Sequence, residues 1–267
     1  MLVPAALSSR VDPRLKAVWL DALHRFRWRR YPVRRVTRAF VRHHGLTVQA
    51  GPFAGMRYPA FAVGRGELVV PQLLGAYEAE LQPAFAEVIA GGFEQIVDIG
   101  ASDGYYAVGL ARGCPEARVQ AYELNPFPAR VCTALAQENA VADRLELRGE
   151  CTLAELRALP VARTFVLCDC EGGEAVLMDP EQVPLLRTSM LVVELHEFAA
   201  PGVEDTIRRR FEPTHDVEIV PTRPRYPADY PSLREVPGTS YMDHALGVAE
   251  FRPLPMKWAI LRPRVDA

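Results

Sequence analysis

The sequence contains no uninterrupted apolar run that approaches the 18 or more residues of a membrane span. Its first ten residues, MLVPAALSSR, lack the basic start and the longer apolar stretch of a signal peptide. No two cysteines form a C-x-x-C pair, and Cys168 and Cys170 alternate with Asp169 along one predicted strand. These absences argue against a membrane anchor and a disulfide framework, so we predict a soluble, cytoplasmic protein with its thiols in the core. The five cysteines are Cys114, Cys132, Cys151, Cys168 and Cys170.

Lysine is also scarce, since Lys16 and Lys257 are the only two, and arginine supplies almost all of the positive charge. The formal net charge is −2, but residues 1–66 hold 13 cationic residues and only two acidic ones. Residues 18–44 combine these arginines with apolar residues at helical spacing and predict a helix interrupted at Pro32. Such a basic arm suits an anionic membrane, a nucleic acid, an acidic partner or substrate, or a second subunit of a homodimer. In the alternative interpretation, the apolar side chains pack the arm onto the rest of the chain; they are Trp28, Val33, Val36 and Phe40.

A glycine-rich segment, VDIGASDGYYAVGLA, spans Val97–Ala111 and lacks the G-x-G pair of the dinucleotide fingerprint. It has instead the order acidic-x-Gly-x-x-x-Gly, formed by Asp98, Gly100 and Gly104, between a predicted strand and a predicted helix. Glycines allow the backbone to turn tightly and to approach a ligand closely. The carboxylate of Asp98 suits the ammonium group of a methionine moiety. This pattern is the one expected of enzymes that bind S-adenosylmethionine (SAM).

The strands that follow end in polar residues, at the edge of the sheet where open α/β folds bind ligands. Glu123 ends the second strand and is predicted to bind ribose hydroxyls, although it could simply lie beside a helix cap formed by Asn125. Glu150 follows the third strand, where it would meet an adenine amino group or solvent. The predicted cofactor-binding residues are Asp98, Gly100, Ser102, Gly104, Glu123, Leu124, Glu150, Cys151 and Asp169.

The run CDCEGGEAVLMDPEQVPLLRTSMLVVELHEF resembles the D-x-E-G-x-E and E-x-H segments of FkbM-type methyltransferases. The loop described above fits the same family, and the resemblance covers about residues 74–220. It implies a class I SAM-dependent enzyme that methylates hydroxyl oxygens of natural products or sugars. The implied fold is an α/β, Rossmann-like, seven-stranded sheet with helices on both faces, here preceded by the helical arm. The resemblance further implies that the reaction end of the site is lined by Asp169, Glu171, Glu174, Glu194 and His196.

Direct displacement at the methyl group requires the protein to position the acceptor and to remove its proton. His196 is the first candidate for the base, because its unperturbed pKa lies near neutrality and it follows a strand end. Asp169 is the second candidate, and Glu194 completes the predicted catalytic set. Because Asp169, Glu171, Glu194 and His196 also offer oxygen and nitrogen ligands, a divalent metal is a further hypothesis, although not the favoured one.

The remaining segments predict an arm and hairpin over residues 1–73 and a methyltransferase domain over residues 74–267. Residues 46–58 predict the hairpin, and residues 71–89 predict a single helix with Tyr77 and Glu78 near its start. Residues 215–221 and 256–263 predict the last two strands. Between these strands, a proline-rich insertion at about residues 221–253 predicts an irregular lid that ends in a helix over 243–251. The predicted substrate contacts are Glu78, Glu171, Glu174, Tyr226 and Tyr241.

Three functions fit the sequence. The first is an O-methyltransferase of a small-molecule acceptor. The second is a methyltransferase that acts on nucleic acid or protein, which the basic arm favours, although the fourth strand carries DCEG and not an N-P-P-Y loop. The third is a SAM-binding module without catalysis.

Overall fold

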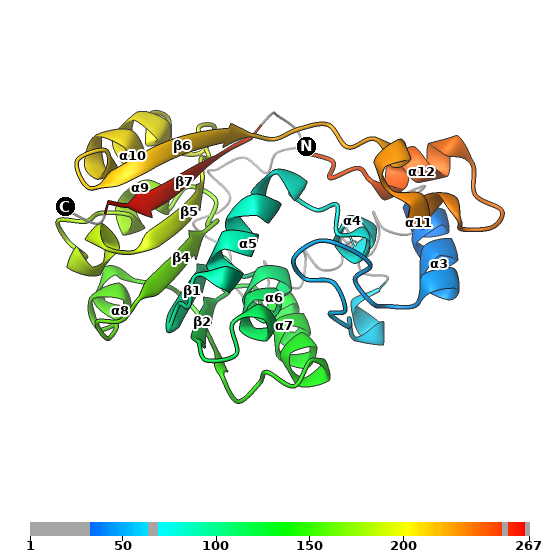
Figure 1. Ribbon diagram of the computed structural model, residues 1–267, viewed down its shortest axis with the longest axis horizontal. Helices are drawn as coiled ribbons and strands as arrows, with labels where there is room; N and C mark the ends of the chain where they lie inside the picture. Colours follow the sequence, from blue (N-terminus) through cyan, green and yellow to red (C-terminus); the bar gives the residue numbers. More distant parts are fainter. Residues whose placement is uncertain (1–32, 64–68, 253–255, 265–267) are drawn as a thin grey trace, which may run out of the picture.

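The computed structural model describes residues 33–63, 69–252 and 256–264. Its centre is a seven-stranded sheet in the order β3-β2-β1-β4-β5-β7-β6, in which β7 alone runs antiparallel to its two neighbours (Figure 1). This arrangement confirms the predicted Rossmann-like sheet of a class I methyltransferase. The strands are β1 (Gln95–Ile99), β2 (Arg118–Tyr122), β3 (Leu145–Arg148), β4 (Thr164–Cys168), β5 (Met190–Glu194), β6 (His215–Pro221) and β7 (Lys257–Pro263).

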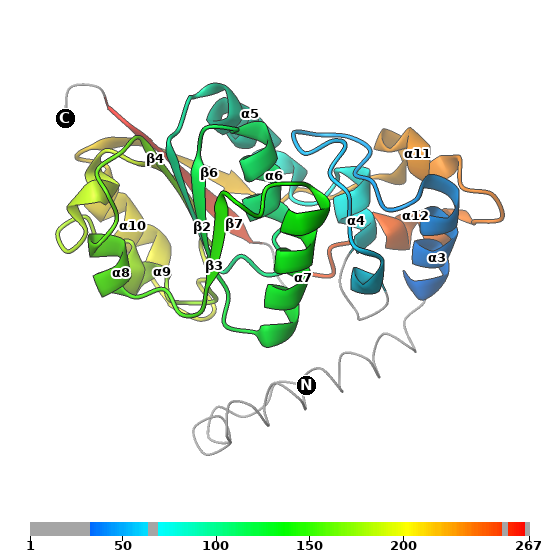
Figure 2. The ribbon, with the colours of Figure 1, turned by 90° about the horizontal axis from the view of Figure 1, so that it is seen from below.

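Helices cover both faces of the sheet, and each face has its own apolar cluster (Figures 1 and 2). The first face is covered by α5 (Gln82–Ala90), α6 (Tyr105–Gly113) and α7 (Pro126–Glu138). The second face is covered mainly by α8 (Leu153–Arg157), α9 (Glu174–Leu177), the 3-10 turn η3 (Pro184–Arg187) and α10 (Val203–Phe211). Every residue of β1, β4 and β5 is buried, because these central parallel strands have helices on both sides.

The loops that follow β1 and β4 meet at the topological switch point of the sheet. There β1 pairs with β2 on one side and with β4 on the other, so the connections after these strands cross to opposite faces. Since β5 lies beside β4, the carboxyl ends of β1, β4 and β5 form one continuous edge. Open α/β sheets bind ligands at such a point.

A small helical lobe lies beside the sheet and joins two distant parts of the sequence (Figures 1 and 2). It contains α3 (Val33–His44), the 3-10 turn η4 (Pro227–Asp229), α11 (Pro231–Arg234) and α12 (Tyr241–Gly247). Arg35 donates a hydrogen bond to the carbonyl of Gly238 at 2.9 Å, and a ring nitrogen of His44 lies 2.6 Å from the carbonyl oxygen of Ser232. Val36 and Phe40 are fully buried, so α3 packs as an integral part of the protein. Trp28 and residues 18–32 of the predicted helix lie outside the described residues.

The predicted helix over residues 71–89 is wrong. The chain forms α4 (Val69–Leu74), then turns, and continues as the 3-10 turn η2 (Ala79–Leu81) and α5. Gly75 breaks the helix with φ +70°, and a Cβ at this position would lie 2.1 Å from the carbonyl oxygen of Ala50. Glu78 also has a positive φ, of 45°. Because α4 spans residues 69–74, the domain boundary that was predicted after residue 73 falls inside this helix.

Residues 46–58 form the short hairpin that the sequence predicted, with one antiparallel bridge between Thr47 and Arg57. Backbone hydrogen bonds join Val48 to Met56 and Tyr58 to Leu46, both at 2.8 Å. A short 3-10 turn, η1 (Ala60–Ala62), follows it. The prediction of an irregular proline-rich insertion needs correction, because η4, α11 and α12 form within it. η4 and α11 pack on α12, and α12 packs on α3. Its last helix ends at Gly247, where the prediction extended it to residue 251. None of the described helices is long and apolar enough to cross a membrane.

Candidate active site

The glycine loop after β1 is held in a conformation that only glycine adopts easily. Gly100 has φ +86°, and a Cβ built on it would lie 1.7 Å from the carbonyl oxygen of Asp169. Gly104 has φ +87° at the start of α6, and its Cβ would lie 2.6 Å from Sγ of Cys132. The two glycines thus allow the loop to pack against β4 and α7 while the amino end of α6 stays at the sheet edge.

Asp98 is the penultimate residue of β1 and has only 1% of its surface exposed. Its Oδ2 atom is buried and has no hydrogen-bond partner. Burial is the main cause that raises the pKa of Asp98 to about 7; the backbone N–H of Ala107 opposes it, and the carboxylates of Glu123 and Asp103 contribute in the same direction as burial. A buried carboxylate oxygen without a donor is costly, so this site favours a ligand that brings a proton donor or a positive charge.

Glu123 follows β2 and lies partly buried beside the glycine loop. It accepts hydrogen bonds from the backbone N–H of Ser102 at 2.9 Å and from that of Asn125 at 2.5 Å. Asn125 does cap α7, with its side chain accepting from Phe127 N–H, and this does not displace Glu123 from the loop. Leu124 beside it is 72% exposed.

Glu150 and Cys151 follow β3 at the same edge of the sheet. Glu150 is exposed and Cys151 is partly buried. The residues predicted to bind the cofactor therefore all lie at or next to the carboxyl ends of β1, β2, β3 and β4.

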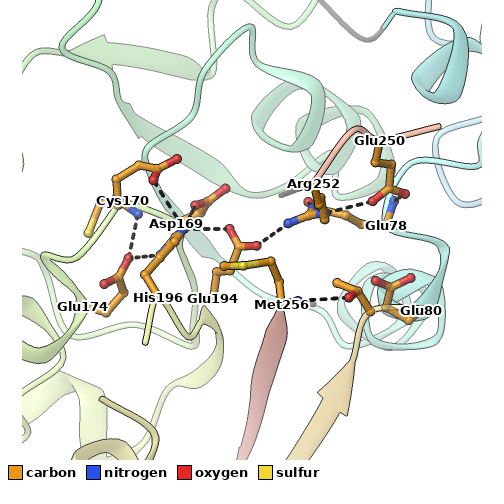
Figure 3. Close-up of polar contacts among 12 residues, drawn as sticks. Glu78, Glu80, Asp169, Cys170, Glu174, Glu194, His196, Glu250, Arg252 and Met256 are labelled. Carbon is orange, nitrogen blue, oxygen red and sulfur yellow. Dashed lines mark hydrogen bonds and ion pairs between the residues drawn. The ribbon is translucent and has the colours of Figure 1, made fainter. Parts of the chain in front are cut away.

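His196 lies at the centre of a cluster of carboxylates beyond the ends of β4 and β5 (Figure 3). Its Nδ1 is 2.7 Å from Oε1 of Glu174, which is fully buried and also accepts from the N–H groups of Cys170 and Gly172. Its Nε2 faces three further carboxylates at ion-pair distance. These are Glu194 at 3.2 Å, Asp169 at 3.6 Å and Glu171 at 3.8 Å.

These contacts fix the protonation of the cluster. Burial alone would lower the pKa of His196, but hydrogen bonds to Glu174 and Glu194 outweigh it and raise the pKa to about 10. Burial raises the pKa of Asp169 well above its usual value, and the nearby charge of Glu194 adds to this effect. For Glu174, burial is opposed by the hydrogen bond from His196, and its pKa is lowered. At neutral pH, His196 is therefore an imidazolium, which does not act as a base.

Two arginines from the insertion, Arg225 and Arg252, extend the cluster, and Arg252 is the one labelled in Figure 3. Arg252 donates to Glu78, to Glu194 at 2.5 Å and to Glu250 at 2.9 Å. Glu78 also accepts from the hydroxyl of Tyr106.

Arg225 donates to Glu80 and lies 3.1 Å from Glu250. Burial raises the pKa of Glu250 to about 7, although the charge of Arg225 opposes this. Glu250 forms ion pairs with both Arg225 and Arg252.

A cavity of about 290 Å³ opens over these groups. Glu78, Glu171 and Phe251 line it with positive φ values of 45°, 56° and 52°, and they are three of the five non-glycine residues with positive φ in the described part of the chain. Backbone strain of this kind concentrates at ligand sites. The complete lining is Tyr77, Glu78, Asp169, Glu171, Glu194, His196, Phe198, Glu250, Phe251, Arg252 and Met256.

The structure brings most of the predicted reaction residues to this cavity, but not all of them. Asp169, Glu171, Glu194, His196 and Glu78 line it directly. Glu174 lies buried behind His196 and reaches the cavity only through the imidazole. Tyr226 and Tyr241 are 60% and 76% exposed on the helical lobe, and neither is among the lining residues.

Sequence reasoning missed Arg252, Glu250 and Phe251, which arrive from the end of the insertion. The available signal was the segment EFRP, which places an acidic and a basic residue just before a predicted strand.

Asp169, Glu171 and His196 also satisfy one condition of a metal site, because one ligand atom from each lies within 4.8 Å of the others. A metal at this position would have to displace the proton that Glu174 and Glu194 favour on His196, because only a neutral imidazole offers a lone pair.

No protein-family model matches the sequence, and no curated protein matches it. Three similar solved structures are methyltransferases. An O-methyltransferase from Bacillus cereus in complex with S-adenosylhomocysteine (SAH) is 16% identical, with 72% of this chain and 89% of that chain covered and a TM-score of 0.45. An O-methyltransferase from Streptomyces achromogenes involved in tomaymycin synthesis, in complex with SAM, is 14% identical, with 87% of this chain and 90% of that chain covered and a TM-score of 0.43. An SAH-bound methyltransferase from Podospora anserina is 15% identical, with 68% of this chain and 79% of that chain covered and a TM-score of 0.43.

Proposed function

We propose that this protein is a SAM-dependent methyltransferase that methylates a hydroxyl oxygen of a small-molecule acceptor, such as a natural product or a sugar. The observation that carries the proposal is the Oδ2 atom of Asp98, which is buried without a hydrogen-bond partner next to the glycine loop that follows β1. An ammonium group would supply both the donor and the charge that this oxygen lacks. The methionine part of SAM carries such a group. The FkbM-like sequence segments and the class I sheet support the same assignment.

The other predicted cofactor residues suit the rest of the same ligand. Glu123 holds Ser102 N–H at 2.9 Å, and its carboxylate can accept from two ribose hydroxyls. Leu124 offers an exposed apolar side chain next to it, and Glu150 and Cys151 continue the edge toward the position of an adenine. Gly100 and Gly104 let the loop pack closely on Asp169 and Cys132, which keeps the loop at this edge of the sheet.

SAM supplies an activated methyl group through its sulfonium, so the protein has only to position the acceptor and to take up one proton. We assign the proton to Asp169. It lines the cavity, and its carboxylate lies 3.6 Å from Nε2 of His196. Asp169 would take up the hydroxyl proton of the acceptor as the acceptor oxygen bonds to the methyl carbon, while the bond from that carbon to the sulfonium sulfur breaks and leaves the neutral thioether of SAH. His196, held by Glu174 and Glu194, orients this carboxylate and balances its charge, in place of the base role that the sequence suggested.

The first experiment is calorimetric titration of the full chain with SAH and, separately, with NAD. We expect micromolar binding of SAH alone. Glu123→Ala should weaken it by about 1–3 kcal/mol through loss of the ribose hydrogen bonds, and Asp98→Asn should weaken it as well. Glu116→Ala is the matched control, because Glu116 is exposed and distant from the loop in sequence. A folded sample that binds neither ligand, or binds NAD, would remove the basis of the proposal.

A further inference from the structure

One face of α3 is strongly basic, with Arg38 and Arg42 exposed and Arg34 partly buried. Arg34, Arg38 and Arg42 recur every four residues, which places them in one stripe with about 6 Å between successive side chains along the axis. The buried residues of the helix, which include Val36 and Phe40, lie on the opposite side. In the part of the chain that the structure describes, none of these three arginines has a carboxylate partner; the one side-chain contact is a hydrogen bond from Arg42 to the carbonyl of Arg38.

Exposed apolar side chains lie on α12, the helix that packs beside α3. α12 packs beside α3, and Arg35 lies 3.2 Å from Asp243 in the first turn of α12. The two residues before Asp243 are Tyr241 and Met242, which are 76% and 66% exposed. The helical lobe thus carries, on two adjacent helices, a row of arginines without a carboxylate partner among the described residues and two large exposed side chains that water solvates poorly.

We propose that this face, Arg34, Arg38, Arg42, Tyr241 and Met242, docks the protein onto an anionic lipid surface. The arginines supply the attraction to lipid headgroups, and the tyrosine and methionine enter the interface between headgroups and acyl chains. The attraction must be local, because the whole chain has a net charge of −2. A nucleic acid would also attract the arginines, but it gives no reason for an exposed methionine beside them.

The lipid surface would receive the lobe that contributes Arg225, Glu250 and Arg252 to the candidate active site. An acceptor that partitions into the bilayer would then reach the enzyme by the same side. This inference does not depend on the cofactor, because the docking face shares no residue with the glycine loop.

The test is sedimentation of the full chain with vesicles of phosphatidylcholine alone or with about a quarter of phosphatidylglycerol. We expect binding to the acidic vesicles only, with a steep loss as salt is raised past physiological strength. Arg34→Gln, Arg38→Gln and Arg42→Gln combined should lower partitioning about a hundredfold, since each arginine contributes roughly a factor of five. Tyr241→Ser with Met242→Ser should lower it at every salt concentration.

The matched control combines Arg118→Gln, Arg130→Gln and Arg209→Gln, which removes the same charge from other exposed positions. It should bind like the unchanged chain. Equal losses in the two triple variants would show a net-charge effect and overturn the proposal. So would an unchanged affinity in the α3 variant, which would place the contact elsewhere. Tighter binding to a duplex oligonucleotide than to the acidic vesicles would favour a nucleic acid as the partner and would also overturn it. SAH titration of the same samples reports separately on the proposed methyltransferase.

Discussion

Two buried histidines of this chain have opposite environments. His196 is enclosed by carboxylates, whereas His215 lies near Arg264 and within 2.9 Å of the carbonyl oxygen of Ser189. For His215, burial lowers the pKa, and the charge of Arg264 lowers it further. We therefore expect His196 to be charged and His215 to be neutral at about pH 7–8, just above the usual histidine pKa of about 6.5.

Nitrogen-15 NMR of ring-labelled histidines checks this expectation, with the variants His196→Gln and His215→Gln assigning the two signals. The same shift predicts a pH dependence of stability. Because the pKa of His196 is raised from 6.5 to about 10 on folding, its stabilising contribution is complete below pH 6.5 and is lost as the pH rises to about 10. The melting temperature should fall over this interval, and less so in His196→Gln. An imidazole signal that titrates at the ordinary pH would contradict both expectations.

Gly100 offers a test of the loop geometry at a single atom. Gly100→Ala introduces a Cβ that would meet the carbonyl oxygen of Asp169 at 1.7 Å, at a φ of +86° that side chains rarely adopt. We expect loss of SAH binding and destabilisation by at least about 1–3 kcal/mol from the strained backbone alone. Gly149→Ala is the matched control, because nothing lies within 4 Å of its Cβ and its φ is ordinary. Calorimetry and thermal unfolding measure both effects; similar behaviour of the two variants would refute the role of the loop.

At the scale of residues, the sequence indicated those site residues whose position depends on a strand end. Asp98, Glu123, Asp169 and Glu194 each follow from the strand pattern and the glycine spacing. The protonation state of His196 could not be predicted from the sequence, because its pKa depends on Glu174, and the two side chains come into contact only in the folded structure.

At the scale of elements, the strands were predictable and two helices were not. Strands β4 and β5 are short apolar runs that end in polar residues, a pattern that sequence alone reveals. The break between α4 and α5 was missed, because Gly75 turns there to admit the carbonyl of Ala50 from a loop distant in sequence. Local periodicity contains no information about such a contact.

The proline-rich insertion was predicted to be irregular for a similar reason. Proline is disfavoured in the interior of a helix but is tolerated in its first turn. Both η4 and α11 begin with a proline, Pro227 and Pro231. Ser240 then starts α12 with a capping box that includes Asp243. These short helices pack on one another and, through α12, on α3. The sequence of the insertion contains no pattern that predicts this contact.

At the scale of the whole molecule, the helical lobe and the sheet are joined by buried charges. Arg252 enters from the insertion and contacts Glu78 and Glu194, whose side chains are almost fully buried. Arg225 makes a second such link through Glu80. These contacts position the lobe over the cavity, so the insertion that was predicted as a lid contributes directly to the wall of the site.

Arg252→Gln should therefore weaken the attachment of the lobe. Two buried carboxylates would lose their cation, and breaking a buried ion pair in this way costs about 3–5 kcal/mol. We expect a lower urea midpoint and faster amide hydrogen exchange across residues 221–252, with less change in β1 and β4. Arg262→Gln is the control, since it breaks comparable contacts to Glu87 and Glu218 at the surface, where such pairs contribute less than about 1 kcal/mol. If both variants lose the same stability, or if exchange in the insertion is unchanged, then apolar packing of α12 on α3 holds the lobe in place, and the arginines serve only the charge balance of the site.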